Sequence, residues 1–283
     1  MPPRSAPTAR QLRLGAELRK MRERAGMTAR EAGELLSANQ ARISNIETGR
    51  FGLSEQRVRT LAHNYACTDE ALVQALVEMT GERNRGWWEE YRDLLPASQL
   101  DLAECEHHAV TVRMATVLHV PGLLQTDGYA RALFRGAVPP LADSDVEHRV
   151  SYRKRRQEIF YRPRPTPYEG FVHEAALRMQ FGGRDTAREQ LQHILDMGER
   201  PGMSIRVVPF TSGVFPGSGQ SVSYFAGPVH QLDTVQLDQS HGMLLLDAEA
   251  QLEKYRQLLD RMESIALPMA KSRDLIHHVI RDL

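Results

Sequence analysis

The stretch MTAREAGELLSANQARISNIETGR, from Met27 to Arg50, decides the fold of the N-terminal part of this chain. It begins with a capping box, in which the Thr28 hydroxyl accepts a free N–H of the first helical turn and the Glu31 carboxylate reaches back. The short turn Ser37-Ala38-Asn39 follows, and Asn39 is a favourable N-cap for a second helix. Gly49 is suited to end that second helix. The stretch therefore predicts two short helices joined by a tight turn.

The outward side of the second helix is the chemically informative part. Ile43 and Ile46 are spaced to point into a core, which leaves the polar residues of this helix facing outward. Amide and guanidinium groups near the N-terminus of such a helix fit a DNA major groove, where Gln binds adenine and Arg binds guanine. A helix-turn-helix that reads bases is therefore predicted. The expected base-reading residues are Gln40, Ala41, Arg42 and Asn45.

Polar residues around the two helices are expected to hold the DNA backbone. Phosphate oxygens accept hydrogen bonds from Arg, Thr and Asn side chains and from helix N-termini. The residues predicted to contact phosphate are Arg24, Thr28, Arg30, Asn39, Thr48 and Arg50. The first helix of the pair is expected to bury a stripe made of Ala32, Leu35 and Leu36.

The charge distribution agrees with a DNA-binding N-terminal part. The whole chain has 36 Lys and Arg and 36 Asp and Glu, so its overall charge does not indicate a nucleic-acid partner. Residues 1–66, however, hold 12 basic and 6 acidic residues, whereas the remainder holds 24 basic and 30 acidic residues. The N-terminal surplus supplies attraction for phosphate that does not depend on base sequence. Taken without the helix-turn-helix, the same surplus would also fit an ordinary solvated surface.

Residues 8–80 resemble the helix-turn-helix domains of the phage-repressor class, the Xre, Cro and C1-type family. The resemblance implies an all-α bundle of five helices. The first is expected over residues 11–24, the fourth from Ser54, and the fifth from Thr68 to Gly81.

The same resemblance implies a structural ion pair. In the family, an Arg late in the first helix pairs with a Glu at the end of the reading helix, and Arg22 and Glu47 match these positions. The chain departs from the family at Ala29, where a Gln that touches phosphate is common, and at Gly33, where Ala is usual. A helical Gly costs about 0.5–1 kcal/mol of helix stability relative to Ala.

Length and composition indicate a second domain. The 283 residues leave about 200 for a further domain with its own core. Two cysteines, Cys67 and Cys105, predict no disulfide and a cytoplasmic protein, associated with the nucleoid when bound to DNA. No apolar run approaches the ~20 residues of a membrane span, so no membrane partner is expected. The expected division is a flexible arm over 1–9, a helix-turn-helix domain over 10–81, and a regulatory and dimerising domain over 84–283.

The pattern beyond residue 84 predicts an α+β domain with a mixed or antiparallel sheet. Helices are expected over residues 87–95, 100–109, 127–135, 145–161, 174–179, 185–199, 248–265 and 270–282. Strands are expected over residues 111–120, 168–173, 204–209, 221–226, 235–238 and 243–246.

Several blocks of this half resemble a C-terminal domain of unknown function that follows Xre-type modules in actinobacteria. The blocks are GWWEEYRDLLP, VPGLLQTDGYARALFR, VHEAALRMQFGG, MSIRVVPF and YRQLLDRMESIAL. Proteins of this group are described as toxin–antitoxin-like or sporulation-type regulators, and their usual genetic neighbour is a small acidic protein. The resemblance implies a chromosomal regulator and no known ligand or reaction. The stretch HQLDTVQLDQSHG departs from the family, which commonly has an aromatic-rich strand there.

No combination of residues in this half indicates catalysis, a metal or a cofactor. Cys105, His107 and His108 fall on different faces of a helix, and no second Cys/His pair lies at zinc spacing. The Gly-rich segment 217–221 lacks the Lys of a phosphate-binding loop. We therefore expect no enzyme.

Two clusters in the second domain have more than one interpretation. The basic run Arg149, Arg153, Lys154, Arg155 and Arg156 fits a solvated helix face paired with Glu147 and Glu158, or a surface for an acidic partner or a second phosphate contact. The aromatic residues fit the domain core, a dimer contact or a ligand cage. They are Trp87, Trp88 and Tyr91.

Two functions remain for the whole chain. The first is a transcription factor that binds a double-stranded DNA operator as a homodimer and senses a small-molecule effector or a partner protein. The alternative is an antitoxin-like module that holds a small acidic partner and binds DNA only to control its own operon. An apolar pocket in the second domain would favour the first function, and an exposed flat patch the second. The first is our expectation.

Overall fold

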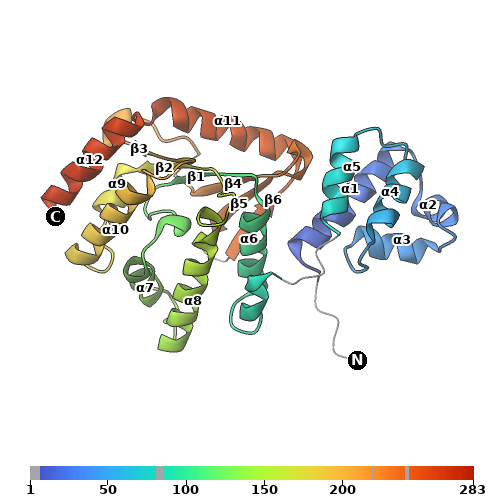
Figure 1. Cartoon of the computed structure of the whole chain (residues 1–283), viewed down its shortest axis with the longest axis horizontal. Coiled ribbons are helices and arrows are strands. Elements are labelled where there is room, and N and C mark those ends of the chain that lie inside the picture. The colour runs from blue at the N-terminus through green and yellow to red at the C-terminus, as the bar shows by residue number, and fades with distance from the viewer. Residues whose placement is uncertain (1–6, 81–85, 218, 240–241) are drawn as a thin grey trace. The chain divides into compact units, whose positions relative to one another are not determined.

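The computed structural model describes residues 7–80, 86–217, 219–239 and 242–283. The chain divides into two compact units, residues 1–89 and residues 90–283 (Figure 1). The expected end of the fifth helix at Gly81 lies outside the described residues, as do Asn84 and Arg85 of the expected break between domains.

The N-terminal unit is all-helical, which confirms the predicted five-helix bundle. Its helices are α1 (Ala9–Arg24), α2 (Ala29–Leu35), α3 (Gln40–Glu47), α4 (Glu55–Asn64) and α5 (Glu70–Glu78). Helix α5 begins after its N-cap Asp69 rather than at Thr68, because the Asp69 carboxylate accepts the N–H of Leu72.

Helix α1 begins earlier than expected. Thr8 is its N-cap, and Thr8 and Gln11 form a reciprocal capping box. The predicted arm over residues 1–9 is therefore wrong at its end: Thr8 and Ala9 belong to the start of α1, and residues 1–6 lie outside the described residues. The capping box satisfies backbone N–H groups at the start of the helix, which is why the helix extends back to this point.

The buried stripe predicted for α2 is correct for Ala32 and wrong for Leu35. Ala32 is buried, whereas Leu35 is 53% exposed. The cause is Gly33, where a side-chain Cβ would lie 2.9 Å from the Ala38 carbonyl oxygen of the following turn. The Gly33 side of α2 therefore packs against the backbone of this turn. Leu35 lies two positions farther along the helix, so its side chain points to the opposite side. Gly33 thus has a packing role beside its cost in helix propensity.

The C-terminal unit is an α+β domain around one mixed sheet, as predicted. Its strands are β1 (Thr111–Thr116), β2 (Tyr168–His173), β3 (Met203–Val208), β4 (Val222–Ala226), β5 (Thr234–Gln239) and β6 (Gly242–Leu246). They lie in the order β3-β2-β1-β4-β5-β6, with the β3–β2 and β2–β1 pairs parallel and the other pairs antiparallel. The longer helices are α6 (Ala97–His108), α7 (Asp127–Arg135), α8 (Asp143–Arg156), α9 (Glu174–Arg178), α10 (Arg184–Met197), α11 (Glu249–Ile265) and α12 (Met269–Asp282).

Side chains of the strands alternate between two cores, as the pleat requires. Helix α11 packs through Leu259 and Met262 on the face that includes Ala115, Phe171 and Tyr224. On the opposite face, residues of α7, α10 and α12 join the alternate strand residues in a larger core. Figure 1 shows α11 alone along one face of the sheet and α8, α9 and α10 on the other.

Several predicted elements have different bounds; α6, for example, begins at Ala97 rather than at Leu100. Residues 87–95 form the short 3₁₀ helix η1 (Trp87–Tyr91), because three residues per turn bring Trp88 and Tyr91 to the same buried side. Strand β1 ends at Thr116, the last of its residues paired with β2, before the 3₁₀ helix η2 (Gly122–Leu124). The expected helix over 145–161 is α8 followed by a tighter turn, η3 (Gln157–Phe160).

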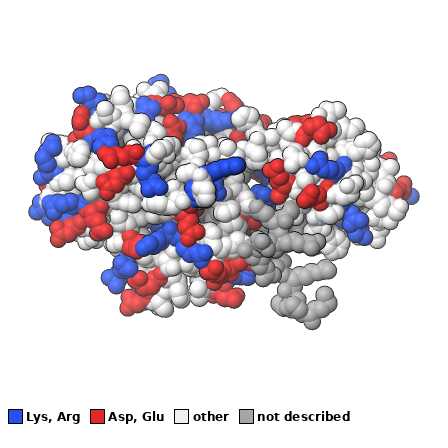
Figure 2. Space-filling view, in the orientation of Figure 1, with Lys and Arg blue, Asp and Glu red and all other residues white. Residues whose placement is uncertain are grey.

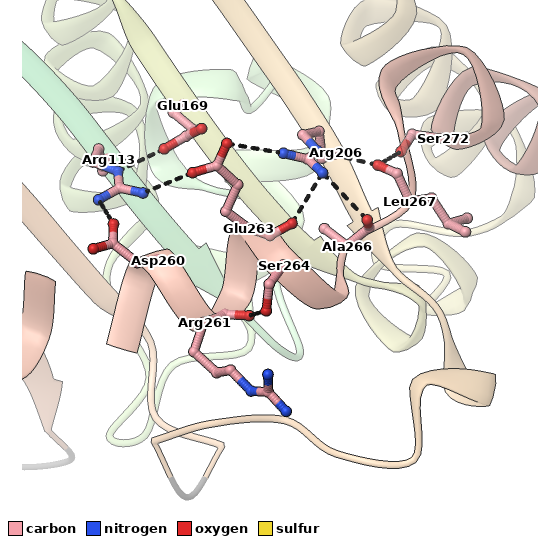
Figure 3. A network of polar contacts seen from close by, with 10 residues as sticks. All are labelled: Arg113, Glu169, Arg206, Asp260, Arg261, Glu263, Ser264, Ala266, Leu267 and Ser272. Carbon is pink, nitrogen blue, oxygen red and sulfur yellow. Dashed lines mark hydrogen bonds and ion pairs between the residues drawn. The ribbon is translucent and has the colours of Figure 1, made fainter. Parts of the chain in front are cut away.

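An arginine network joins α11 to the sheet (Figure 3). Arg113 of β1 binds Glu169 of β2 at 2.5 Å and Asp260 of α11 at 2.8 Å. Arg206 of β3 donates to the backbone oxygens of Glu263 and Ala266 at 2.9 and 3.3 Å. These carbonyls lie at the C-terminus of α11, where no intrahelical donor remains for them. The two arginines therefore fix the position of α11 on the sheet.

Candidate DNA-binding surface

Helix α3 has a buried side and an exposed polar side. Ile43 and Ile46 are buried, at 1% and 3% exposure. Gln40, Ala41 and Arg42 are exposed, as predicted for residues that reach DNA bases. The fourth predicted base-reading residue, Asn45, is half-buried, and its carbonyl accepts the N–H groups that follow the helix. The exposed residues cluster in the first turn of α3, where backbone N–H groups also point outward.

The start of α3 is fixed by its cap. The Asn39 side-chain oxygen accepts the N–H of Arg42 at 2.9 Å. The turn before it requires a left-handed residue, and Ser37 takes that conformation with φ 50°. The amide nitrogen of Asn39 has no hydrogen-bond partner within the described part of the chain, so it remains available as a donor toward phosphate.

The six predicted phosphate contacts fall into two groups. Arg24 and Arg50 are exposed and make no ion pair with a described residue. The same is true of Arg42 in the first turn of α3. Arg30 is exposed but pairs with Glu34 at 3.1 Å. The hydroxyls of the two threonines are engaged locally.

These local bonds limit what the threonines can offer. The Thr28 hydroxyl donates to Glu31 at 2.8 Å within the capping box of α2. The Thr48 hydroxyl donates to the Ser44 carbonyl at 2.8 Å. Both therefore stabilise helix ends, and the exposed arginines are the better phosphate donors of the set.

Arg22 and Glu47 form the ion pair that joins α1 to the end of α3. Arg22 Nε and Nη2 donate to the two carboxylate oxygens of Glu47 at 2.6 and 2.9 Å, in a two-pronged arrangement. The remaining Nη1 donates to the Met27 carbonyl at 2.6 Å, in the loop before α2. The side chains are only 9% and 8% exposed. One guanidinium thus holds both α3 and the entry to α2 on α1.

A residue that the sequence interpretation missed makes this approach possible. A Cβ on Gly15 of α1 would lie 2.5 Å from the Glu47 carbonyl oxygen and 2.7 Å from that of Ile46. Such distances leave no room for a side chain, so the backbone of α1 touches the C-terminus of α3. The available signal was a Gly in the middle of a helix, where it costs stability unless close packing requires it.

Comparison with protein families gives two matches along the chain. Residues 13–76 match the family described as a helix-turn-helix domain. Residues 99–278, more than half of the chain, match a domain of unknown function, DUF5753. The chain belongs to this DUF5753 family. No curated protein and no solved structure matches it. The first match begins within α1 and ends within α5, so the N-terminal unit has the fold of a helix-turn-helix domain, which suggests a DNA-binding regulator.

The predicted aromatic candidates are mostly part of the chain's own core. Trp88 and Tyr91 are 4% and 7% exposed, and the Tyr91 hydroxyl lies 2.9 Å from that of Ser151. For these two residues the burial agrees with the domain-core interpretation, and buried side chains cannot supply the alternative dimer contact or open ligand cage. Trp87 is half-buried, with its ring 5.9 Å from that of Trp88.

Basic and acidic side chains are interspersed over the larger unit on the face shown in Figure 2. Among the described residues, no group of His, Cys, Asp and Glu is placed to hold a metal ion. In the same residues, no helix has both the length and the apolar character needed to cross a membrane.

The Arg22–Glu47 pair gives a direct stability test. Glu47→Ala leaves a buried guanidinium without its carboxylate, which costs about 3–5 kcal/mol. We expect the melting transition of the N-terminal unit in the full chain to move to a lower temperature, as followed by calorimetry. The control is Glu34→Ala, because Glu34 pairs with Arg30 within α2 but is 64% exposed. An equal effect of both variants would contradict the assigned role of Glu47.

Proposed function

We propose that this protein is a transcriptional regulator of the Xre class that binds a double-stranded DNA operator through α3. The observation behind this proposal is the exposed first turn of α3, with Gln40 and Arg42 free on a helix that is fixed from behind by Arg22 and Glu47. A rigidly held helix that presents an amide and a guanidinium suits base recognition in the major groove.

The proposed roles divide among the exposed residues. Gln40 and Arg42 would contact base edges, Ala41 would contact a thymine methyl group, and Asn45 would support the far end of the helix. Arg24, Arg50 and the Asn39 amide would bind phosphate. We assign the protein to the cytoplasm of an actinobacterium, assign it no catalytic activity, and assign the C-terminal unit a regulatory role.

Gln40→Ala tests the reading role. Loss of a two-pronged contact to one base weakens binding to the cognate operator by about 1–3 kcal/mol, with little effect on random DNA. The operator is first selected from a random duplex library with the full chain, and affinities are then measured by fluorescence anisotropy at one salt concentration. The control Gln56→Ala removes an exposed amide from the first turn of α4. An equal loss on operator and random DNA would rule out base reading by Gln40.

We also propose that the regulator acts as a homodimer joined through the C-terminal unit. One helix-turn-helix contacts few bases, so useful specificity requires two copies on half-sites one helical turn apart. With Trp88 and Tyr91 buried, the most suitable surface is β6, an edge strand of sequence GMLLL in which Leu244 is 41% exposed. An open apolar edge is a template for pairing with a second chain.

The dimer proposal is tested by sedimentation equilibrium of the full chain. We expect a dimer for the unmodified protein and a monomer for Leu244→Lys, because a charge on the edge strand opposes strand pairing. Met179→Lys is the control, since Met179 is 42% exposed at the end of α9, away from the sheet edge. A monomeric unmodified chain, or a dimer that survives Leu244→Lys, would contradict the proposal.

A further inference from the structure

The basic run of α8 is not one solvated face. Arg155 pairs with Glu90 at 2.5 Å and Lys154 with Asp127 at 3.3 Å, both near the surface. Glu147, a predicted partner of this run, binds Arg131 instead. Arg156 turns inward. The sequence analysis assigned one role to all of these residues. In the structure their side chains point in different directions from α8 and have different partners.

Arg156 shows how an enclosed guanidinium is satisfied in this unit. Its Nε and Nη2 donate to the two carboxylate oxygens of Glu106 at 2.7 and 2.5 Å. Both residues are almost completely buried, at 4% and 1% exposure. The Nε–Nη2 edge is the side of a guanidinium that matches two oxygens of one carboxylate or phosphate.

Arg153, one turn away, has the same edge unoccupied. Its Nη1 donates to the Gln125 side-chain oxygen at 2.5 Å, and its guanidinium lies 4.6 Å from the centre of the Phe134 ring. Its Nε is buried and has no acceptor among the described residues, and no described carboxylate lies within ion-pair distance. Burial and the charge of Arg156 lower the pKa of Arg153 to about 10, so it remains a cation at neutral pH. The Arg153 side chain as a whole is half-buried, and its Nε is a polar donor withdrawn from water without a bonded acceptor, which is costly.

Arg149, on the same side of α8, also has a buried Nε without an acceptor among the described residues. It lies four residues before Arg153, which places the two side chains next to each other along the helix. Arg149 also forms no ion pair in the described part of the chain. A Cβ on Gly122 would lie 3.5 Å from Arg156 Nη2 and 3.8 Å from the Arg153 guanidinium carbon, so the Gly122 backbone lies beside both guanidinium groups.

We propose that Arg153 and Arg149 form a binding site for the oxyanion of a small-molecule effector, with the Nε–Nη2 edge of Arg153 as its anchor. The ligand chemistry is a carboxylate or phosphate group, because both present two oxygens at the spacing of that edge. Gln125 fixes the guanidinium through Nη1, and the Phe134 ring supports its flat face. This inference rests on the regulatory role proposed for the C-terminal unit. Anion binding is measured without DNA, so its failure can be distinguished from a failure of DNA binding.

The test is calorimetric titration of the full chain with three sodium salts: malonate, inorganic phosphate and glycerol phosphate. Chloride buffer keeps the ionic strength fixed, so that general charge screening is constant. We expect saturable binding of one anion per chain for at least one salt, and the salt that binds most tightly identifies a carboxylate or a phosphate ligand. No saturable binding of any of the three would overturn the proposal.

Matched variants of α8 locate the site. Arg153→Gln should weaken binding about tenfold or more, because it removes a charged two-pronged donor. Lys154→Gln removes the same charge from the next residue, which is 69% exposed, and should change affinity less than about twofold. Equal weakening by both variants would mean unspecific attraction and would overturn the proposal. Should Arg153→Gln fail to fold, Arg149→Gln takes its place with the same expected contrast.

Discussion

The two-pronged ion pair between Arg22 and Glu47 is the interaction on which the DNA-binding surface depends. It joins the last turn of α1 to the last turn of α3, and the third nitrogen of the same guanidinium holds the loop before α2. Gly15 removes the side chain that would keep α1 and α3 apart. Polar residues of α3 are therefore exposed on a helix whose direction is fixed by a buried charge and a backbone contact, rather than by its own short length.

Arginine has the same structural role in the C-terminal unit. Arg156 joins α8 to Glu106 of α6, and Arg113 and Arg206 join the sheet to α11 (Figure 3). In each case a planar guanidinium binds two or more oxygens from elements far apart in the chain. Arg153 differs from these arginines: its side chain is half-buried, and its Nε is buried without an acceptor among the described residues. This contrast is the basis for assigning it to a ligand.

The sequence predicted what local chemistry determines and missed what distant residues determine. Capping boxes and N-caps act over three residues, so the starts of α2 and α3 were predictable from Thr28 and Asn39. The outward turn of Leu35 depends on the backbone beside Gly33, and the inward turn of Arg156 depends on Glu106, 50 residues earlier. The sheet order, with β1 between β2 and β4, is likewise a long-range property.

Hydrogen exchange of the full chain, with and without a duplex of random sequence at low salt, tests most directly the claim that α3 is the DNA-binding surface. Low salt favours contacts to phosphate that do not depend on base sequence. We expect slower exchange over residues 38–50, which include the turn and α3, and no change over α8. DNA binding with unchanged exchange over residues 38–50 would contradict it.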